Sequence, residues 1–326
     1  MNWERFFVVG PTASGKSGLA LALAQKFSGL IINSDSLQFF KDLKIGTAYP
    51  SESDFEKVPH HLFGICDLEE EFTAGEFVRR YHKFEDQLLV SDASTSSVLP
   101  RVRPLLIVGG SGFYIRALET GMFPVAQDSM TADLPREHEG WPKEKKLEFL
   151  KEHDPEYLAK IGVNDLYRID RAIQLFLAEG KTMTEFHEHM QEQKKNHLEA
   201  ETEAFAFKLG VYVERDELLE RVKERTHKML TLGLIDEVKA LDEKVKNKQW
   251  KPLQSVGYKE TLDFIQGEGV KTQDELYELI VKNTMNLAKR QMTWFRSDPD
   301  VVWFHSQKDE LKAMLWMEEQ LEQYLD

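Results

Sequence analysis

A glycine-rich segment near the start of the chain has the residue types and spacing of a phosphate-binding loop. Its eight residues fit the pattern G-x-x-x-x-G-K-[ST] at every position, and they are Gly10, Pro11, Thr12, Ala13, Ser14, Gly15, Lys16 and Ser17. Glycines allow the backbone to wrap so that its amides point at anionic oxygens, and the helix that follows adds its positive N-terminal end. Lys16 supplies a positive charge, and the Ser17 hydroxyl can bind Mg²⁺. The segment therefore predicts a site for a polyphosphate ligand, without indicating which one.

A carboxylate, Asp35, is predicted to face this loop. It follows the short apolar run at residues 30–33 and lies between Ser34 and Ser36. Open α/β sheets bind ligands at the carboxyl ends of their strands, so an acid there can take a proton from an attacking nucleophile. The alternative is a structural role in an Asx turn or a helix cap. The loop and Asp35 together indicate a group transfer, as in several P-loop small-molecule kinases, and leave the transferred group open.

Three short apolar runs indicate the strands that position these groups. They occupy residues 5–9, 30–33 and 105–108, and each ends in small polar or glycine residues. Helical patterns follow them, as at residues 17–27. Strands alternating with helices indicate a mainly parallel sheet with helices on both faces. We therefore predict an α/β fold of the P-loop NTPase-like kind, with its ligand at the carboxyl edge of the sheet.

The middle of the chain has a different character, which predicts a helical insertion. Residues 121–198 contain few β-branched runs and many Lys, Glu and His, and a strand-like segment at residues 204–213 then returns to the sheet. Helical patterns in the second half of the chain begin near residues 143, 165, 215, 234 and 275. We expect residues 1–120 and 199–326 to form the catalytic core and residues 121–198 to form the insertion domain.

The composition restricts the class of protein. With 326 residues, 41% of them hydrophobic, the chain can bury the cores of one large domain and a smaller one. Its net charge of −14 argues against indiscriminate nucleic-acid binding, although a local basic groove is compatible with it. Cys66 is the single cysteine, so an internal disulfide and a thiolate zinc site are excluded. No apolar run approaches the length of about 20 residues that a membrane span needs. A strand pattern begins directly at the N-terminus, so we expect no signal peptide. We expect a cytoplasmic monomer that does not enter a membrane.

One stretch of this acidic protein, residues 280–296, carries cations and no acid. The cations are Lys282, Lys289, Arg290 and Arg296. Such a face can bind a nucleic-acid backbone, with Trp294 available for stacking or packing. The alternative is a core helix with a solvated basic side, because apolar residues share the stretch.

Seven short motifs resemble those of the tRNA dimethylallyltransferases of the bacterial type. They are residues 33–38 (N-S-D-S-L-Q), 45–48 (I-G-T-A), 59–62 (P-H-H-L), 108–114 (V-G-G-S-G-F-Y), 164–165 (N-D) with Arg168 and Arg171, 256–260 (V-G-Y-K-E) and 289–294 (K-R-Q-M-T-W). One such motif would be weak evidence, whereas seven in the right order, over nearly the whole chain, are specific.

The resemblance implies that the loop, which in other proteins holds ATP, binds dimethylallyl diphosphate, and that tRNA is the acceptor. The target is the adenosine immediately 3′ of the anticodon, whose exocyclic amine attacks the carbon bearing the diphosphate. Asp35 then matches the general base, and Ser111 lines the channel where donor and acceptor meet. Loop amides, Lys16, an arginine from Arg168 or Arg171, and Mg²⁺ on Ser17 stabilise the leaving diphosphate.

The resemblance also implies which segments contact tRNA. Besides Ser111, they comprise Asp35, Ser36, Leu37 and Gln38, then Tyr167, Arg168, Ile169, Asp170 and Arg171, and finally Gln254, Ser255, Val256, Gly257, Tyr258 and Lys259. Lys289 and Arg290 are added from the basic stretch. We expect the insertion on the side of the anticodon stem-loop, whose single-stranded loop lets a protein enclose one base. Its residues 127–135 lack the arginines that bacterial relatives often place on the stem.

Other classes of protein stay open. A P-loop kinase acting on a nucleotide or small metabolite would also use Asp35 as a base. An adenylate isopentenyltransferase acting on free AMP or ATP would need no long tRNA-facing surface, so the insertion argues against it. A binding module without activity would have little use for a phosphate loop opposite an acid. The adjacent His60 and His61 cannot easily chelate one metal ion and are expected to hold a loop.

Overall fold

The structure, a computed structural model, describes residues 3–68, 70–93, 103–120, 137–138, 140–189, 207–245 and 250–323. The chain divides into two compact units. Met1–Glu119 and Ala204–Asp326 form the first, and Thr120–Glu203 forms the second. Each unit has its own apolar core, so each can be described by itself.

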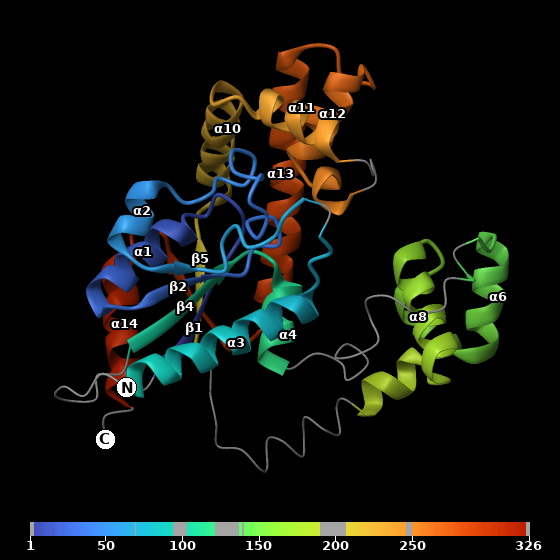
Figure 1. The fold of residues 1–326 in the computed structure, drawn as a ribbon, viewed down its shortest axis with the longest axis horizontal. Helices are drawn as coiled ribbons and strands as arrows, with labels where there is room; N and C mark the ends of the chain where they lie inside the picture. The colour runs from blue at the N-terminus through green and yellow to red at the C-terminus, as the bar shows by residue number, and fades with distance from the viewer. Residues whose placement is uncertain are drawn as a thin grey trace. The chain divides into compact units, whose positions relative to one another are not determined.

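A six-stranded parallel sheet is the centre of the first unit (Figure 1). In sheet order its strands are β3 (His60–His61), β2 (Leu30–Asn33), β4 (Arg103–Gly109), β1 (Trp3–Val9), β5 (Phe207–Tyr212) and β6 (Val301–His305). All of β2 and the last six residues of β4 are buried, as expected for strands that are covered on both faces. The predicted parallel α/β fold is confirmed. The two edge strands were not predicted, because β3 is only a dipeptide and β6 follows the last recognisable motif.

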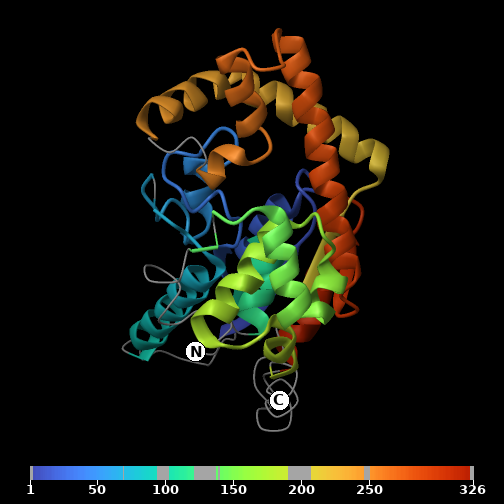
Figure 2. The same cartoon turned by 90° about the vertical axis from the view of Figure 1, so that its right-hand side faces the viewer.

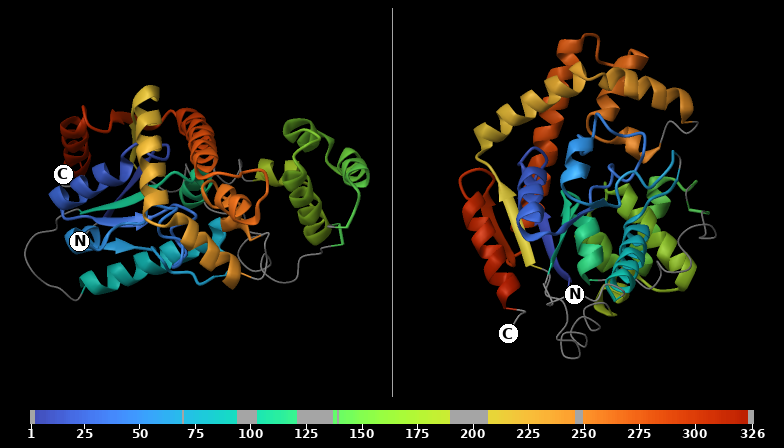
Figure 3. Two further views of the ribbon diagram at one scale, coloured as in Figure 1. Left: turned by 90° about the horizontal axis from the view of Figure 1, so that it is seen from above. Right: turned by 60° about the vertical axis from the view of Figure 1, so that its left-hand side comes forward.

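Helices cover both faces of this sheet (Figure 3). On one face lie α1 (Lys16–Phe27) and α14 (Glu310–Glu322), which pack through side chains such as Leu23 and Met317. On the other lie α3 (Ala74–Ala93) and α4 (Gly112–Thr120), through side chains such as Tyr81 and Ile115. A short helix, α2 (Glu52–Lys57), precedes β3 and begins at a capping box made by Ser51 and Asp54. Both sides of β1 are therefore buried, which fixes the phosphate loop that follows it.

A second group of helices extends beyond one end of the sheet, as Figure 2 shows. It comprises α10 (Arg215–Thr231), α11 (Leu234–Lys244), the 3₁₀ turn η1 (Lys251–Gln254), α12 (Tyr258–Gln266) and α13 (Gln273–Arg296). Gly233, with φ of 98°, separates α10 from α11 as predicted. Thr272 and Glu275 form a capping box that starts α13, a helix of 24 residues that packs along α10 and α12.

A buried lysine joins three segments of the first unit. Lys208 on β5 has 6% of its side chain exposed and forms ion pairs with Glu119 and with Asp298, at 2.6 Å from Asp298 Oδ2. Burial alone would lower the pKa of Lys208, but its bonds to the two carboxylates outweigh burial and raise it. Glu119 ends the first segment of this unit, and Lys208 lies near the start of its second segment. The cluster therefore holds together the two points between which the second unit is inserted.

The second unit is a small helical bundle. Its helices are α6 (Lys143–His153), α7 (Pro155–Ile161) and α8 (Leu166–Glu179), and its core includes Leu150, Ile169 and Ile173. Asp154 starts α7 by accepting the N–H of Tyr157 at 3.2 Å. The helices predicted near residues 143 and 165 are confirmed. No helix within the described ranges of either unit has the length and apolar character needed to cross a membrane.

Candidate functional site

The phosphate loop lies between the carboxyl end of β1 and the start of α1. Gly10 is required by close packing, because a Cβ there would lie 2.3 Å from the carbonyl oxygen of Val211 on β5. Gly15 adopts a φ of 92°, a left-handed conformation that favours glycine. The structure therefore requires glycine at these two positions for different reasons, close packing at Gly10 and a left-handed conformation at Gly15.

Not every residue of the loop offers an N–H group to a ligand. Pro11 has none, the N–H of Ser14 is donated to the Pro11 carbonyl, and the N–H of Thr12 is donated to Gln291 Oε1 at 2.8 Å. The first N–H groups of a helix have no acceptor within that helix. The N–H groups that can bind a ligand are therefore those at the end of the loop and the start of α1, from Gly15 onward. They lie next to the exposed Ser17.

Three charged side chains interact beside the loop: Lys16, Asp35 and Arg225. The Lys16 ammonium is partly buried and donates to the Pro11 carbonyl at 3.2 Å. Burial, opposed by the negative charge of Asp35 and assisted by the positive charge of Arg225, lowers the pKa of Lys16 to about 8. Burial also lowers the pKa of Arg225, again against the attraction of Asp35. One carboxylate and two cations therefore interact electrostatically at the carboxyl edge of the sheet, where an anion can bind.

The contacts of the Asp35 carboxylate are compatible with both predicted roles, the Asx turn and the proton acceptor. Its Oδ1 accepts the N–H of Leu37 at 3.1 Å, which is the Asx-turn contact. Its own N–H is donated at 2.8 Å to the side chain of Asn33, which is fully buried and fixes the end of β2. Within the described residues Oδ2 has no hydrogen-bond partner. One oxygen holds the turn, and the other remains able to accept a proton.

The loop after β4 meets the loop after β2. Ser111 Oγ accepts the N–H of Ser36 at 3.3 Å and lies 3.4 Å from Ser36 Oγ. Gln291 on α13 connects this loop to the phosphate loop, since its Nε2 donates to the Gly110 carbonyl at 3.0 Å while its Oε1 holds Thr12. The ends of β1, β2 and β4 are thus joined around one region, as the strand-end argument predicted.

Glu237 on α11 anchors the loop that carries the I-G-T-A motif. Its carboxylate accepts the N–H groups of Lys44, Ile45 and Gly46, and it also accepts the hydroxyl of Tyr258 at 2.8 Å. Tyr258 is fully buried, and burial raises the pKa of its phenol. A Cβ on Gly46 would lie 2.5 Å from the Tyr258 ring, so the glycine allows this ring to pack.

Two residues of the predicted tRNA-binding set, Tyr258 and Ile169, have buried side chains. Tyr258 supports Glu237, and Ile169 belongs to the core of the second unit. A contact of either side chain with RNA would require the helices around it to separate. Their neighbours are accessible: Gln254 is exposed, and Ser36, Leu37 and Gln38 are half-buried. The segments as a whole stay predictions.

The remaining candidates of the second unit make contacts within that unit. Tyr167 has 68% of its surface exposed, and Arg168 pairs with Asp165 at 3.4 Å. Asp170 pairs with Lys146 at 2.7 Å. Arg171 donates to Gln174 at 2.6 Å, and burial lowers the pKa of Arg171. A role of Arg168 or Arg171 at the phosphate loop stays a prediction.

The basic stretch forms one exposed side of α13. Its buried side includes Ile280, Ala288 and Phe295, whereas Lys289 and Arg290 are exposed and have no carboxylate within ion-pair distance among the described residues. A surface depression of about 600 Å³ runs along this side, lined by Asn286, Lys289, Arg290, Thr293, Trp294 and Ser297. One side of the helix is therefore core and the other presents cations without an acidic partner among the described residues, while binding of a nucleic-acid backbone by this side stays a prediction.

The other residues singled out in the sequence are structural. Cys66 is fully buried, and burial raises the pKa of its thiol to about 11. His60 and His61 form the edge strand β3, and burial lowers the pKa of both rings. Among the residues that the structure describes, no three His, Cys, Asp or Glu side chains gather as a metal site.

Three residues that the sequence did not point to contribute to the site: Arg225, Glu237 and Gln291. Arg225 lies on a helix rich in charges of both signs, and its electrostatic interaction with Asp35 and Lys16 distinguishes it. Gln291 stands inside the K-R-Q-M-T-W motif, which was read for its cations alone. For Glu237 no sequence signal separates it from the other acids of α11.

A phosphate loop after β1 that faces an acid after β2 defines the class of P-loop group-transfer proteins. A family model described as IPP transferase matches residues 38–298, and one described as isopentenyl transferase matches residues 4–64. The tRNA dimethylallyltransferase of Bdellovibrio bacteriovorus is 41% identical over 306 residues, covering 91% of this chain and 92% of the relative. The tRNA dimethylallyltransferase 1 of Citrifermentans bemidjiense is 38% identical over 90% of this chain and 89% of its own. The chain belongs to the tRNA dimethylallyltransferase family.

Solved structures agree with this fold. A tRNA isopentenylpyrophosphate transferase of Staphylococcus epidermidis aligns with a TM-score of 0.64 at 26% identity, over 99% of this chain and 100% of its own. A eukaryotic dimethylallyltransferase acting on tRNA aligns with a TM-score of 0.75 at 24% identity, over 94% of this chain and 75% of its own. At such low identity the second likeness bears on the fold alone.

Proposed function

We propose that this protein transfers a dimethylallyl group from dimethylallyl diphosphate to the exocyclic amine of the adenosine immediately 3′ of the anticodon in tRNA. The observation that carries the proposal is the cluster of Lys16, Asp35 and Arg225 beside the phosphate loop. It provides a base and two cations at one place, in a chain whose relatives of 38% and 41% identity are named tRNA dimethylallyltransferases. The protein acts in the cytoplasm as a monomer.

The chemistry is one substitution at carbon. The adenosine nitrogen forms a bond to the carbon that bears the diphosphate, the carbon–oxygen bond breaks, and diphosphate leaves with the electron pair. The nitrogen then releases a proton, which Asp35 Oδ2 accepts while Oδ1 keeps its bond to Leu37. Lys16, Arg225 and the N–H groups from Gly15 onward stabilise the charge that grows on the leaving diphosphate. Ser111, bonded to Ser36, lies where the acceptor base enters.

Ser17 suits a Mg²⁺ ion that is held mainly by the substrate. Its hydroxyl is exposed at the start of α1, and the described residues gather no carboxylate cage for a metal. Mg²⁺ prefers few protein ligands together with phosphate oxygens and waters, so this donor set fits it. When bound, the ion supplies further positive charge to the diphosphate.

The acceptor side uses exposed groups on both units. Lys289 and Arg290 bind the RNA backbone, and the depression beside Trp294 offers a surface against which a base can pack. Gln254 and the turn from Ser36 to Gln38 contact the anticodon loop. The helical insertion contacts the anticodon stem-loop through the exposed Tyr167 and its neighbours.

The test is a transfer assay with two acceptors and one exchange of the donor. The protein is incubated with Mg²⁺, dimethylallyl diphosphate and unmodified tRNA that carries adenosine after the anticodon, and the digested nucleosides are analysed by mass spectrometry. Parallel reactions contain AMP in place of tRNA, or ATP in place of the prenyl donor. We expect isopentenyl adenosine only with tRNA. Product on AMP would identify a nucleotide-modifying enzyme instead, and ATP consumption without prenyl transfer would identify a kinase.

A further inference from the structure

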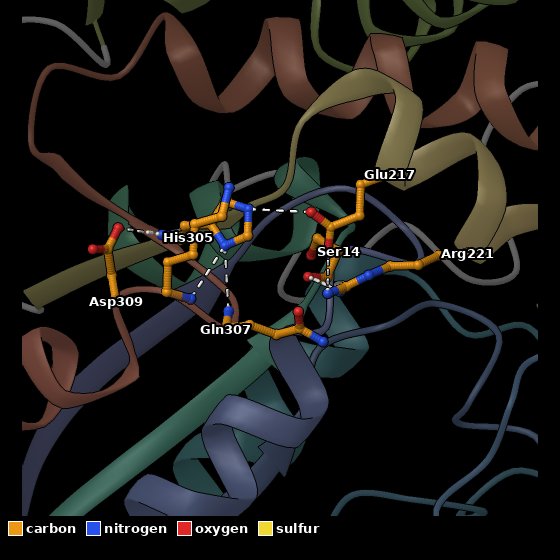
Figure 4. Close-up of polar contacts among 7 residues, drawn as sticks. Ser14, Glu217, Arg221, His305, Gln307 and Asp309 are labelled. Carbon is orange, nitrogen blue, oxygen red and sulfur yellow. Dashed lines mark hydrogen bonds and ion pairs between the residues drawn. The ribbon is translucent and has the colours of Figure 1, made fainter.

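Behind the phosphate loop, a chain of polar contacts leads from the segment after β6 through α10 to the loop (Figure 4). Arg221 Nη1 donates to the backbone carbonyl of Ser14 at 3.1 Å, and its Nη2 donates to Glu217 Oε1 at 2.7 Å. The other carboxylate oxygen, Oε2, lies 3.3 Å from His305 Nε2. His305 Nε2 makes no hydrogen bond among the described residues, so this last contact is an electrostatic one. Glu217 thus connects Arg221 with a buried histidine.

The ring of His305 is fixed by the backbone around it. Its Nδ1 accepts the N–H groups of Gln307 at 3.4 Å and Lys308 at 3.3 Å, and the residue is 2% exposed. Because Nδ1 acts as acceptor, the ring proton is on Nε2, the nitrogen that faces Glu217. The N–H of His305 is donated to Asp309 Oδ2 at 3.0 Å. The turn after β6 therefore determines where the histidine, and through it Glu217 and Arg221, can lie.

The loop rests directly on this network. A Cβ on Gly15 would lie 2.9 Å from Arg221 Nη1 and 3.1 Å from the Cβ of Ser306. Ser306 is 9% exposed, whereas Gly15 itself is exposed to solvent on its other side. The Ser14–Gly15 peptide therefore has one side covered by Arg221 and Ser306 and one side open.

The orientation of this peptide decides which of its polar groups an anion meets. A trans peptide directs its C=O and its N–H to opposite sides. With the Ser14 carbonyl held from behind by Arg221, the Gly15 N–H faces the open side. Glycine permits the alternative peptide orientation at little cost, and that orientation would present a carbonyl oxygen to the diphosphate.

We propose that Arg221 is a positioning residue, held by Glu217 and His305, that keeps the Gly15 N–H directed at the diphosphate. This inference rests on the proposed function of the same loop. None of the three side chains touches the reacting atoms. Glu217 and Arg221 lie within residues 38–298, which the family model matches, whereas His305 and Ser306 lie beyond them.

The experiment compares conservative and disruptive variants of the network. Arg221→Gln and His305→Leu remove the contacts. Arg221→Lys keeps the charge but lacks the fork that reaches two acceptors, and His305→Gln keeps a donor for Glu217. Lys223→Gln on the same helix is the matched control, because it removes a cation with 42% of its side chain exposed, whose ion-pair partner among the described residues is Glu220. The dissociation constant of inorganic pyrophosphate is measured by calorimetry, and steady-state kinetics give the KM for dimethylallyl diphosphate and for tRNA.

We expect Arg221→Gln and Arg221→Lys to weaken pyrophosphate binding about tenfold, the value of one oriented charge-assisted hydrogen bond. The KM for dimethylallyl diphosphate should rise in parallel, and the KM for tRNA should stay unchanged. His305→Leu should weaken pyrophosphate binding about threefold, with His305→Gln restoring most of it. Lys223→Gln should bind pyrophosphate like the wild type.

Three results would overturn the proposal. Wild-type affinity in Arg221→Lys would mean that only the charge matters. Equal losses of pyrophosphate affinity in Arg221→Gln and Lys223→Gln would also mean that only the charge of the residue matters. A rise in the KM of both substrates together with a lower melting temperature would make the network merely structural. Because pyrophosphate binding needs no turnover, a wild type that binds pyrophosphate but transfers no prenyl group would contradict the proposed function and leave this inference standing.

Discussion

The polar groups of the phosphate loop and those on the exposed side of α13 differ in how firmly the protein holds them. Around the loop, Thr12 and Ser14 are each held by a bond to a distant helix, and Lys16 is held by a bond to Pro11 within the loop. On α13, Lys289 and Arg290 are exposed and have no acidic partner among the described residues. A small ligand of fixed shape is best bound by groups that are already oriented, because orientation then costs nothing when the charge develops. A long polyanion can be bound by mobile cations that exchange its counterions.

The same helix serves both arrangements. Gln291 points from α13 into the two glycine loops, and the residues just before it, Lys289 and Arg290, face solvent. Successive residues of a helix point about 100° apart, so three neighbours can divide between an interior and an exterior role. If this division is correct, substitutions near the loop should impair chemistry and donor binding, whereas substitutions on the exposed side should impair tRNA binding alone.

The largest effect is expected at Asp35. Asp35→Ala should lower the turnover number about 10²–10⁴-fold, because the transferred proton loses its acceptor, while tRNA still binds. Asp35→Asn should be equally impaired, although its side-chain oxygen can still accept the N–H of Leu37 and preserve the turn. Single-turnover kinetics and a filter-binding measurement with tRNA would check both variants.

Asp67→Ala is the control for these variants, since it removes an exposed carboxylate that is paired only with surface groups such as Lys41. Its turnover should match the wild type. If Asp35→Asn were fully active while Asp35→Ala was not, the turn alone would explain Asp35, and its role as base would be wrong.

The next effect concerns Arg225. Arg225→Gln should lower kcat/KM for dimethylallyl diphosphate about 10²-fold, since one cation that stabilises the leaving group is lost. The same change should raise the pKa of Lys16, because a like charge that lowers it has been removed. In the wild type, donor affinity should fall as pH rises through about 8, where Lys16 loses its proton. In the variant, this fall should move to higher pH.

Calorimetric titration of the donor between pH 7 and pH 10 would measure both curves. A diphosphate ester has finished its own ionisation below this range, by analogy with phosphate groups whose last pKa is about 6. Arg215→Gln, at the exposed start of the same helix, is the matched control and should leave the pH profile in place. Identical pH profiles for the wild type and Arg225→Gln would contradict the assignment of Arg225 to this cluster.

The sequence predicted the parts of this site that depend on strand ends. Lys16 and Asp35 could be placed beside each other because parallel strands bring their carboxyl ends to one edge. Arg225, Glu237 and Gln291 could not be placed, since each reaches the site from a helix far along the chain whose angle is set by packing. The same limit explains Tyr258: the motif around it was recognised, but only the packing against Gly46 reveals that its side chain faces inward.

A smaller effect is expected on the exposed side of α13. The double variant Lys289→Gln and Arg290→Gln should bind tRNA about tenfold more weakly near 0.1 M salt, with the slope of log K against log salt reduced by about 1.4. The turnover number at saturating tRNA should not change. Lys312→Gln on α14 is the control, because it removes an equally exposed lysine away from this face. An unchanged salt slope in the double variant would leave α13 as a core helix with a solvated side.

The smallest effect is expected at Tyr258. This residue tests whether a buried side chain of the predicted tRNA-binding set contributes to stability or to tRNA binding. Tyr258→Phe removes the hydroxyl that is donated to Glu237 but keeps the ring that packs on Gly46. The free energy of unfolding should fall by about 1 kcal/mol, the usual value of one hydrogen bond, and the affinity for tRNA should not change. Chemical denaturation and tRNA binding would be measured together. Tyr277→Phe is the control, since within the described residues the Tyr277 hydroxyl has no hydrogen-bond partner. A loss of tRNA affinity in Tyr258→Phe at unchanged stability would mean that α12 opens when RNA binds, and this buried side chain would then belong to the acceptor surface after all.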